Sequence, residues 1–334
     1  MIIIGCDFHS RFQQIAMLDT ETGEITERRL ENSEAGAFYG ALPGGARIGM
    51  EATGYARWFE RLLRELGQEL WVGDAAKIRA GMVRKQKNDP RDARHILDLL
   101  NSNRFPRIWI SGPQERDVWH LLRHRDKLVR WQTGLRNQLH ALAMGEGLCQ
   151  KKKLWSEAGR QQLQALELGD WGNRRRKDLL QMLDQMAPAI AELDQAVQQQ
   201  VQQRPAAVLL QQQAGVGPVT SLAFALAVGP IERFANSKKL VSYLGLNPSE
   251  HSSAGRQRFG AISKQGNTLV RYLLVQAAQT ASRNDPELRR DYKRLVFRRG
   301  TQVAKVAIAR KVAVRLYWKL RKAGAPSASD SHAG

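Results

Sequence analysis

Two long segments in the middle of the chain carry hydrophobic residues at the spacing of packed α-helices. The first, residues 116–144, contains no proline and places leucines seven residues apart, at Leu121, Leu128, Leu135 and Leu142. A seven-residue period puts these side chains on one stripe of an α-helix, which is stable in water when a second helix covers it. The segment is therefore predicted to be a long helix of a helical hairpin or coiled coil.

The second segment supplies a matching stripe. Its hydrophobic residues alternate at spacings of four and three positions: Leu179, Leu183, Met186, Ile190, Leu193 and Val197. Pro188 interrupts this stripe, and because proline lacks the N–H that a helix interior uses, it is expected to kink or break the helix. Two interpretations of the pair stay open, a structural helical bundle or an arm through which two copies associate. Residues 145–172 between the segments receive no assignment.

The regions on either side differ in character. Before residue 110, short apolar runs separated by turn residues predict strands at 2–6, 14–18, 25–30, 47–51 and 69–72, with a helix at 55–66. After Pro205, the composition predicts helices at 206–214, 219–227, 237–244, 269–282 and 302–322. We therefore expect an α/β domain over 1–110, a coiled-coil or helical linker domain over 111–204, a mainly α-helical domain over 205–324 and a disordered tail over 325–334.

The sequence carries a large excess of positive charge. Its 52 Lys and Arg residues against 32 Asp and Glu residues give a formal net charge of +20. More than half of that excess falls between Arg283 and Lys322, where 14 basic residues stand against three acidic ones. Single basic clusters are typical of solvated helix faces, but this block together with clusters at 151–153 and 174–177 indicates a surface for a phosphate backbone. Within the block, the residues expected to contact nucleic acid are Arg298, Arg299, Arg310 and Lys311.

Other features narrow the class of protein. Two cysteines, Cys6 and Cys149, are too few for a disulfide framework or a four-thiolate zinc site. His9 and His95 lie near acidic residues, but their spacing resembles no zinc site. No apolar run reaches the length that spans a membrane, and the N-terminal run is too short for a signal peptide. We therefore expect a cytoplasmic, nucleoid-associated protein without membrane contact.

Four carboxylates have positions that suit a metal site. Asp7 and Glu51 each end a predicted strand, and Asp89 and Asp92 are three residues apart, on nearly one face if a helix begins there. Carboxylate oxygens are the ligands that Mg²⁺ and Mn²⁺ prefer, with Mg²⁺ the first choice here. Two such ions can activate a nucleophile and stabilise the leaving oxygen of a phosphodiester.

Each carboxylate also has a structural explanation. Asp89 suits a helix N-cap and Asp92 suits the first turn, where a negative charge is favoured by the helix dipole. Asp7 alone is typical of a turn residue, and Glu51 alone of a surface charge. Capping and metal binding are compatible, because a carboxylate has two oxygens.

Two loops in the C-terminal region could bind phosphate. Gly215 and Gly217 separate predicted helices, and with Thr220 they resemble a helix-hairpin-helix motif, in which backbone N–H groups bind phosphate. The alternative is a plain turn between helices.

The second loop, residues 245–258, combines hydroxyl groups with cations. Ser252 and Ser253 could present a hydroxyl to a phosphate, or the segment is an ordinary serine-rich surface loop. The nucleic-acid contacts expected around this loop are Arg256, Arg258 and Lys264.

Five short motifs occur in a recognisable order: Gly5–Asp7, Met50–Gly54, Lys87–Ala93, Ala214–Thr220 and Tyr243–Pro248. In this order they resemble the DEDD insertion-sequence transposases, a family that includes relatives of the Piv DNA invertase and the bridge-RNA-guided serine recombinases. Each motif alone is a weak signal, and the five together cover nearly the whole chain.

The resemblance implies a RuvC-like (RNase H-like) N-terminal domain whose acidic, metal-binding tetrad is Asp7, Glu51, Asp89 and Asp92. It implies a coiled-coil region for assembly into a homodimer or homotetramer, and a C-terminal transposase domain with a nucleophilic serine. In the family this serine forms a covalent phosphoserine with DNA, and the tetrad assists across a dimer. A noncoding RNA pairs with donor and target DNA.

The nucleophile is less closely matched than the tetrad. The family pattern has Ser followed by Gly, whereas Ser253 is followed by Ala254, so Ser253 is the first candidate and Ser252 the alternate. The resulting prediction is a transposase or site-specific recombinase of an insertion sequence, acting on double-stranded donor and target DNA. The alternatives are a RuvC-like junction nuclease that uses water, and a non-catalytic architectural protein that binds DNA or RNA.

Overall fold

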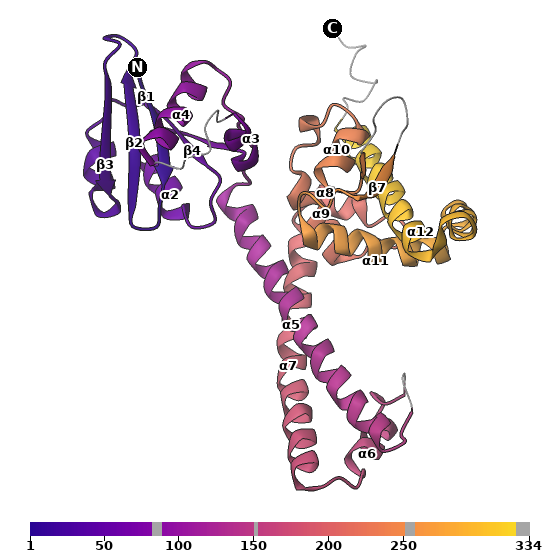
Figure 1. Cartoon of the computed structure of the whole chain (residues 1–334). Helices are drawn as coiled ribbons and strands as arrows, with labels where there is room; N and C mark the ends of the chain where they lie inside the picture. Colours follow the sequence, from indigo (N-terminus) through magenta and orange to yellow (C-terminus); the bar gives the residue numbers. More distant parts are fainter. Residues whose placement is uncertain (82–88, 150–152, 251–257, 325–334) are drawn as a thin grey trace. The chain divides into compact units, whose positions relative to one another are not determined.

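The computed structural model describes residues 1–81, 89–149, 153–250 and 258–324 (Figure 1). The chain divides into two compact units, Met1–Ile110 and Ser111–Gly334. The first is built on a five-stranded sheet and the second is mainly helical. The expected order, an α/β region followed by a mainly α-helical one, is confirmed. Across the described ranges, no helix combines the length and the apolar composition needed to cross a membrane.

The five strands of the first unit have nearly the predicted residue ranges. They are β1 (Ile2–Phe8), β2 (Phe12–Asp19), β3 (Ile25–Glu31), β4 (Arg47–Glu51) and β5 (Glu69–Gly73). Their order is β3-β2-β1-β4-β5, with β1, β2 and β3 antiparallel and β4 and β5 parallel to β1.

The predicted end of β1 was wrong. β1 continues past Cys6, because Asp7 and Phe8 remain paired with Gln14 and Gln13 of β2. Asp7 therefore lies inside the strand, where pairing with β2 fixes its backbone.

Helices cover both faces of this sheet. On one face lie α1 (Ala35–Gly40), which follows the short η1 (Asn32–Glu34), and α2 (Arg57–Glu65). On the other face lie α3 (Ala75–Ala80) and α4 (Asp89–Asn101). Alternate residues of β1 enter two different cores: Ile4, Cys6 and Phe8 pack with α1 and α2 residues, whereas Ile3 packs with α4. Because side chains of a strand alternate between faces, Asp7 belongs to the α4 face with Ile3.

The second unit begins with two long helices that run antiparallel (Figure 1). They are α5 (Pro113–Gly145) and α7 (Asp170–Gln202), with the short α6 (Glu157–Gln164) between them. Both predicted long helices are confirmed. The four leucines of the predicted stripe are only partly buried, whereas Leu122, Leu139 and Ala143 of the same helix are fully buried. Association of two copies through this arm stays a prediction.

Of the two outcomes expected at Pro188, a break is wrong, because helix α7 continues across this proline. A kink stays a prediction. Pro188 lies on an exposed side of the helix, so the carbonyl oxygen that loses its N–H partner can be hydrated instead.

The rest of the second unit is a helical core with one small hairpin of strands. Its elements are α8 (Pro205–Leu210), α9 (Pro218–Val228), η2 (Ile231–Arg233), α10 (Ser237–Tyr243), β6 (Pro248–Glu250), β7 (Phe259–Ile262), α11 (Thr268–Asn284) and α12 (Pro286–Ala323). Val197 and Val201 of α7 share one hydrophobic core with Ala207 and Leu210 of α8. A separate domain boundary at residue 204 stays a prediction.

Helix α12 is bent back on itself. Gly300 interrupts it with a non-helical φ of 79° and ψ of 165°. Arg315, after the bend, pairs with Asp285 and Glu287 before it, both at 2.5 Å. Lys311 pairs in the same way with Asp291. We call this arrangement the α12 hairpin, and residues 297–303 its tip.

Candidate functional site

The sheet places two of the four predicted carboxylates next to each other on adjacent strands. Cys6 of β1 is opposite Met50 of the parallel strand β4, so the next residues, Asp7 and Glu51, are neighbours at the carboxyl ends of both strands. Glu51 follows Gly49 on the α4 face, where a Cβ at position 49 would lie 2.5 Å from the Leu100 side chain of α4. Both carboxylates therefore belong to the face that α4 covers.

Helix α4 brings the other two carboxylates to this face. Asp89 and Asp92 occupy its first turn, where the partial positive charge of the helix N-terminus stabilises them. The helix approaches β1 very closely, because a Cβ at Gly5 would lie 2.2 Å from the carbonyl oxygen of Ala93. The glycine of the Gly5–Asp7 motif thus sets how near the first turn of α4 comes to Asp7.

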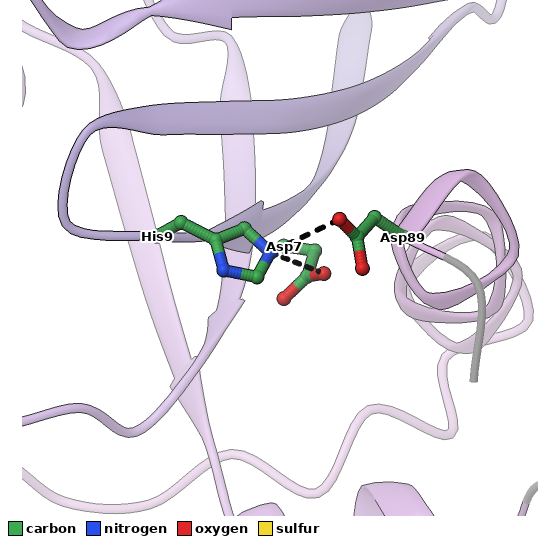
Figure 2. Close-up of side chains that lie close together, drawn as sticks. All are labelled: Asp7, His9 and Asp89. Atoms are coloured by element: carbon green, nitrogen blue, oxygen red, sulfur yellow. Dashed lines mark hydrogen bonds and ion pairs between the residues drawn. The ribbon is translucent and has the colours of Figure 1, made fainter.

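Figure 2 shows where two of these carboxylates meet, both facing the same ring nitrogen of a histidine. His9 Nε2 is 3.0 Å from Asp7 Oδ2 and 3.7 Å from Asp89 Oδ2. Ligand atoms of the three residues lie within 4.8 Å of one another, so the group can hold a metal ion. His9 was not assigned to the site from sequence; the available signal was its position two residues after Asp7.

The charges around Asp7 are crowded. Burial raises the pKa of Asp7, the nearby His9 lowers it, and the negative charges of Asp92 and Asp89 raise it again. A divalent cation would relieve this repulsion and replace the water that burial removes. The donor set, carboxylate oxygens with one imidazole nitrogen, fits a cation such as Mg²⁺ or Mn²⁺ and does not select between them.

Glu51 and Asp92 lie beside this cluster without entering it. The Glu51 carboxylate accepts a hydrogen bond from the Arg79 guanidinium at 3.0 Å. Asp92 acts on Asp7 through its charge. The structure therefore brings Asp7, His9 and Asp89 within ligand distance, with Glu51 on the neighbouring strand.

Both candidate nucleophiles, Ser253 and Ser252, lie outside the described residues. Arg256 also lies outside them. The described ends of this loop are the strands β6 and β7, which pair with each other. Arg258 and Lys264 are exposed, and Lys264 has a positive φ of 56°.

The glycine-containing turn before α9 has a clear packing role. Gly215 has a φ of 84°, and a Cβ there would lie 2.4 Å from the carbonyl oxygen of Ala277 in α11. Gly217 is the N-cap of α9, with open space around its Cβ position. Thr220 is buried in the first turn of that helix, 9% exposed. Phosphate binding at this turn stays a prediction.

The basic residues selected in the C-terminal block have different surroundings. Arg298, Arg299 and Arg310 are exposed. The Lys311 amine instead donates to the Asp291 carboxylate, which pairs with Arg294 as well. Lys311 therefore helps to close the α12 hairpin.

Comparison with known protein families gives two matches that together span most of the chain. Residues 4–145 match a transposase model of the DEDD, IS110 type. Residues 207–293 match the model described as the transposase IS116/IS110/IS902 family. The first match contains Asp7, Glu51, Asp89 and Asp92, and the second contains the candidate serine loop.

Several curated proteins are similar to the chain over most of its length. A probable family 20 transposase of Pseudomonas aeruginosa is 30% identical, over 95% of this chain and 96% of the relative. The transposase for insertion sequence element IS1111A of Coxiella burnetii is 27% identical, over 95% and 89%. The transposase for insertion sequence element IS1328 of Yersinia enterocolitica is 23% identical, over 83% of each protein.

Proposed function

Because the chain belongs to the IS116/IS110/IS902 family of transposases, we propose that it moves an insertion sequence through a covalent serine–phosphate intermediate. Transposases of this family cleave and rejoin DNA. The proposal adds the mechanism, which is of the serine-recombinase type related to the Piv invertase. The observation that carries its metal-dependent part is the convergence of Asp7, Asp89 and His9 at the carboxyl end of β1, and the serine is assigned from the family resemblance.

The first unit would supply the metal site. The strand order β3-β2-β1-β4-β5 supports a RuvC-like fold, and Asp7, Glu51, Asp89 and Asp92 would form its acidic tetrad. A divalent cation bound there would lower the pKa of an attacking hydroxyl and stabilise charge on the phosphate. The chain's own task would be to hold the carboxylates close together, and the register of β1 with β4 and the position of the first turn of α4 support this.

The second unit would supply the nucleophile. The hydroxyl of Ser253, or of Ser252 as the alternate, attacks a DNA phosphorus and loses its proton. The phosphodiester bond on the opposite side breaks, and the leaving oxygen takes up a proton to become a free DNA hydroxyl. Attack of a DNA hydroxyl on the phosphoserine reverses these changes and rejoins a strand without an external energy source.

Further partners follow from the same proposal. A noncoding bridge RNA would select donor and target DNA by base pairing, while basic surfaces of the protein bind the backbones. A second copy would complete the catalytic centre by bringing its tetrad to the serine, in a homodimer or homotetramer. The exposed Arg298, Arg299 and Arg310 support a nucleic-acid surface.

The decisive experiment is to trap the covalent intermediate. The full chain, Mg²⁺, the transcript of the element and a DNA fragment that spans its end are mixed and then denatured. We expect an adduct that survives denaturation, with a nucleotide on the peptide that contains Ser253. Ser253→Ala should abolish it; if Ser252 is the nucleophile, Ser252→Ala does so instead.

Ser249→Ala is the matched control, because the Ser249 hydroxyl lies in the same region and donates to the carbonyl oxygen of Ala261. It should form the adduct normally. Cleavage by the Ser252→Ala, Ser253→Ala double variant with free DNA ends would show instead a nuclease that uses water. Recombination that persists in Asp7→Ala and Asp92→Ala variants would refute the metal site.

A further inference from the structure

The tip of the α12 hairpin exposes an aromatic ring almost completely. Phe297 is 94% exposed and Val303 is 53% exposed, and every residue from 297 to 303 is exposed. Gly300 forms the bend with a positive φ, and no atom lies within 4 Å of its Cβ position. A ring in water on a projecting bend contributes nothing to the hydrophobic core, so packing among the described residues does not explain it.

Charge pairing differs between the base and the tip of the hairpin. At the base, Arg315 and Lys311 are neutralised by Asp285, Glu287 and Asp291. At the tip, Arg298 and Arg299 make no ion pair with any residue that the structure describes. The tip therefore combines an uncovered ring with two available guanidinium groups.

We propose that this tip is a wedge for duplex DNA, with Phe297 against the base stack and Arg298 and Arg299 on the flanking phosphates. The inference rests on the proposed function, which makes DNA the substrate. An apolar protein groove would cover the ring, but it would desolvate two cations unless it also supplied acids. A duplex offers both surfaces at once, because apolar side chains can enter between base steps while phosphates accept the adjacent arginines.

The test compares binding of the full chain to a short fluorescent DNA duplex at several salt concentrations. Phe297→Ala should weaken binding by about five- to a hundredfold, the range for loss of one base–aromatic stacking contact, with an unchanged salt dependence. Phe297→Leu keeps an apolar wedge and should retain most of the affinity. The Arg298→Gln, Arg299→Gln double variant should reduce the slope of log affinity against log salt by about two.

Trp171→Ala is the matched control, since Trp171 of α7 is another aromatic residue with an 86% exposed side chain. It should bind DNA like the parent chain. Equal affinity of Phe297→Ala and the parent would overturn the wedge. The wedge would also be overturned if Phe297→Ala changed the oligomeric mass, or weakened binding to the element's RNA, while its affinity for duplex DNA stayed that of the parent. Failure of the parent chain to bind DNA at all would instead count against the proposed function.

Discussion

A methyl group at Gly5 is expected to push α4 away from the sheet. In the structure a Cβ at this position would lie 2.2 Å from the carbonyl oxygen of Ala93 and 2.4 Å from the backbone nitrogen of Leu97. Both neighbours are backbone atoms, so no side-chain rotation can relieve the contact. The helix must withdraw by about 1 Å to reach a tolerable separation, and overpacking of this kind costs about 1–3 kcal/mol.

The expected result for Gly5→Ala is a lower melting temperature of the first unit. A loss of 1 kcal/mol shifts the melting of a domain of this size by about 4–8 °C, so the fall should be roughly 5–20 °C. Thermal unfolding followed by circular dichroism of the full chain measures it. The affinity for Mn²⁺ should fall as well, because α4 carries Asp89 away from Asp7.

Gly36→Ala provides the control, since Gly36 lies in helix α1 with no atom within 4 Å of its Cβ position. It should melt at the parent temperature or somewhat above it, because alanine favours a helix over glycine by up to about 1 kcal/mol. Parent-like melting of Gly5→Ala would refute the close contact between α4 and β1.

The remaining predictions concern charged groups. His9→Gln should remove the nitrogen coupling from the electron spin echo spectrum of bound Mn²⁺, because the imidazole lies beside Asp7 and Asp89; a persistent coupling would exclude His9 as a ligand. Arg79→Gln should raise Mn²⁺ affinity up to about fivefold by calorimetry, since it frees Glu51 from an exposed ion pair worth about 1 kcal/mol or less; unchanged or weaker binding would contradict this. Lys311 lowers the pKa of Asp291 below its ordinary value of 3.8, so the pair stabilises the fold above that pH and the contribution is lost as the pH falls through the lowered pKa. Asp291→Asn should therefore cost about 1–2 kcal/mol at pH 7 and less near pH 3 in thermal melts, and an equal cost at both pH values would refute the assignment.

The sheet could be predicted because its strands carry a local signal. Short apolar runs in β1 and β2, and turn residues beside them, indicate where each strand lies. The end of β1 was missed because it depends on pairing with Gln13 and Gln14, polar residues that give no hydrophobic pattern.

The first half of the α12 hairpin was missed for a different reason. Residues 286–299 are rich in charged residues and their apolar stripe, Leu288, Tyr292 and Leu295, is short, so the sequence predicted a helix only from 302 onward. In the structure the acids at its start pair with Arg315, which is 28 residues beyond Glu287. Such a long-range interaction leaves no mark on local periodicity.

Part of the candidate site follows from residue type alone. The three-residue spacing of Asp89 and Asp92 suited the start of a helix, and α4 begins there. The contact of Asp89 with His9 depends on how α4 crosses β1, which is a tertiary property. His9 therefore had no distinguishing pattern until the helix was placed.

The long pair α5 and α7 has a consequence for how the protein unfolds. A helix of 33 residues is about 50 Å long, and both helices have this number of residues. One end of the pair packs into the main helical core through Val118 and Val201, while the other end has its own core around Leu139 and Leu163. No residue of α5 from 123 to 138 is fully buried between these cores. The distal end can therefore open and exchange its amide hydrogens as a separate cooperative unit, while the core at the base stays folded.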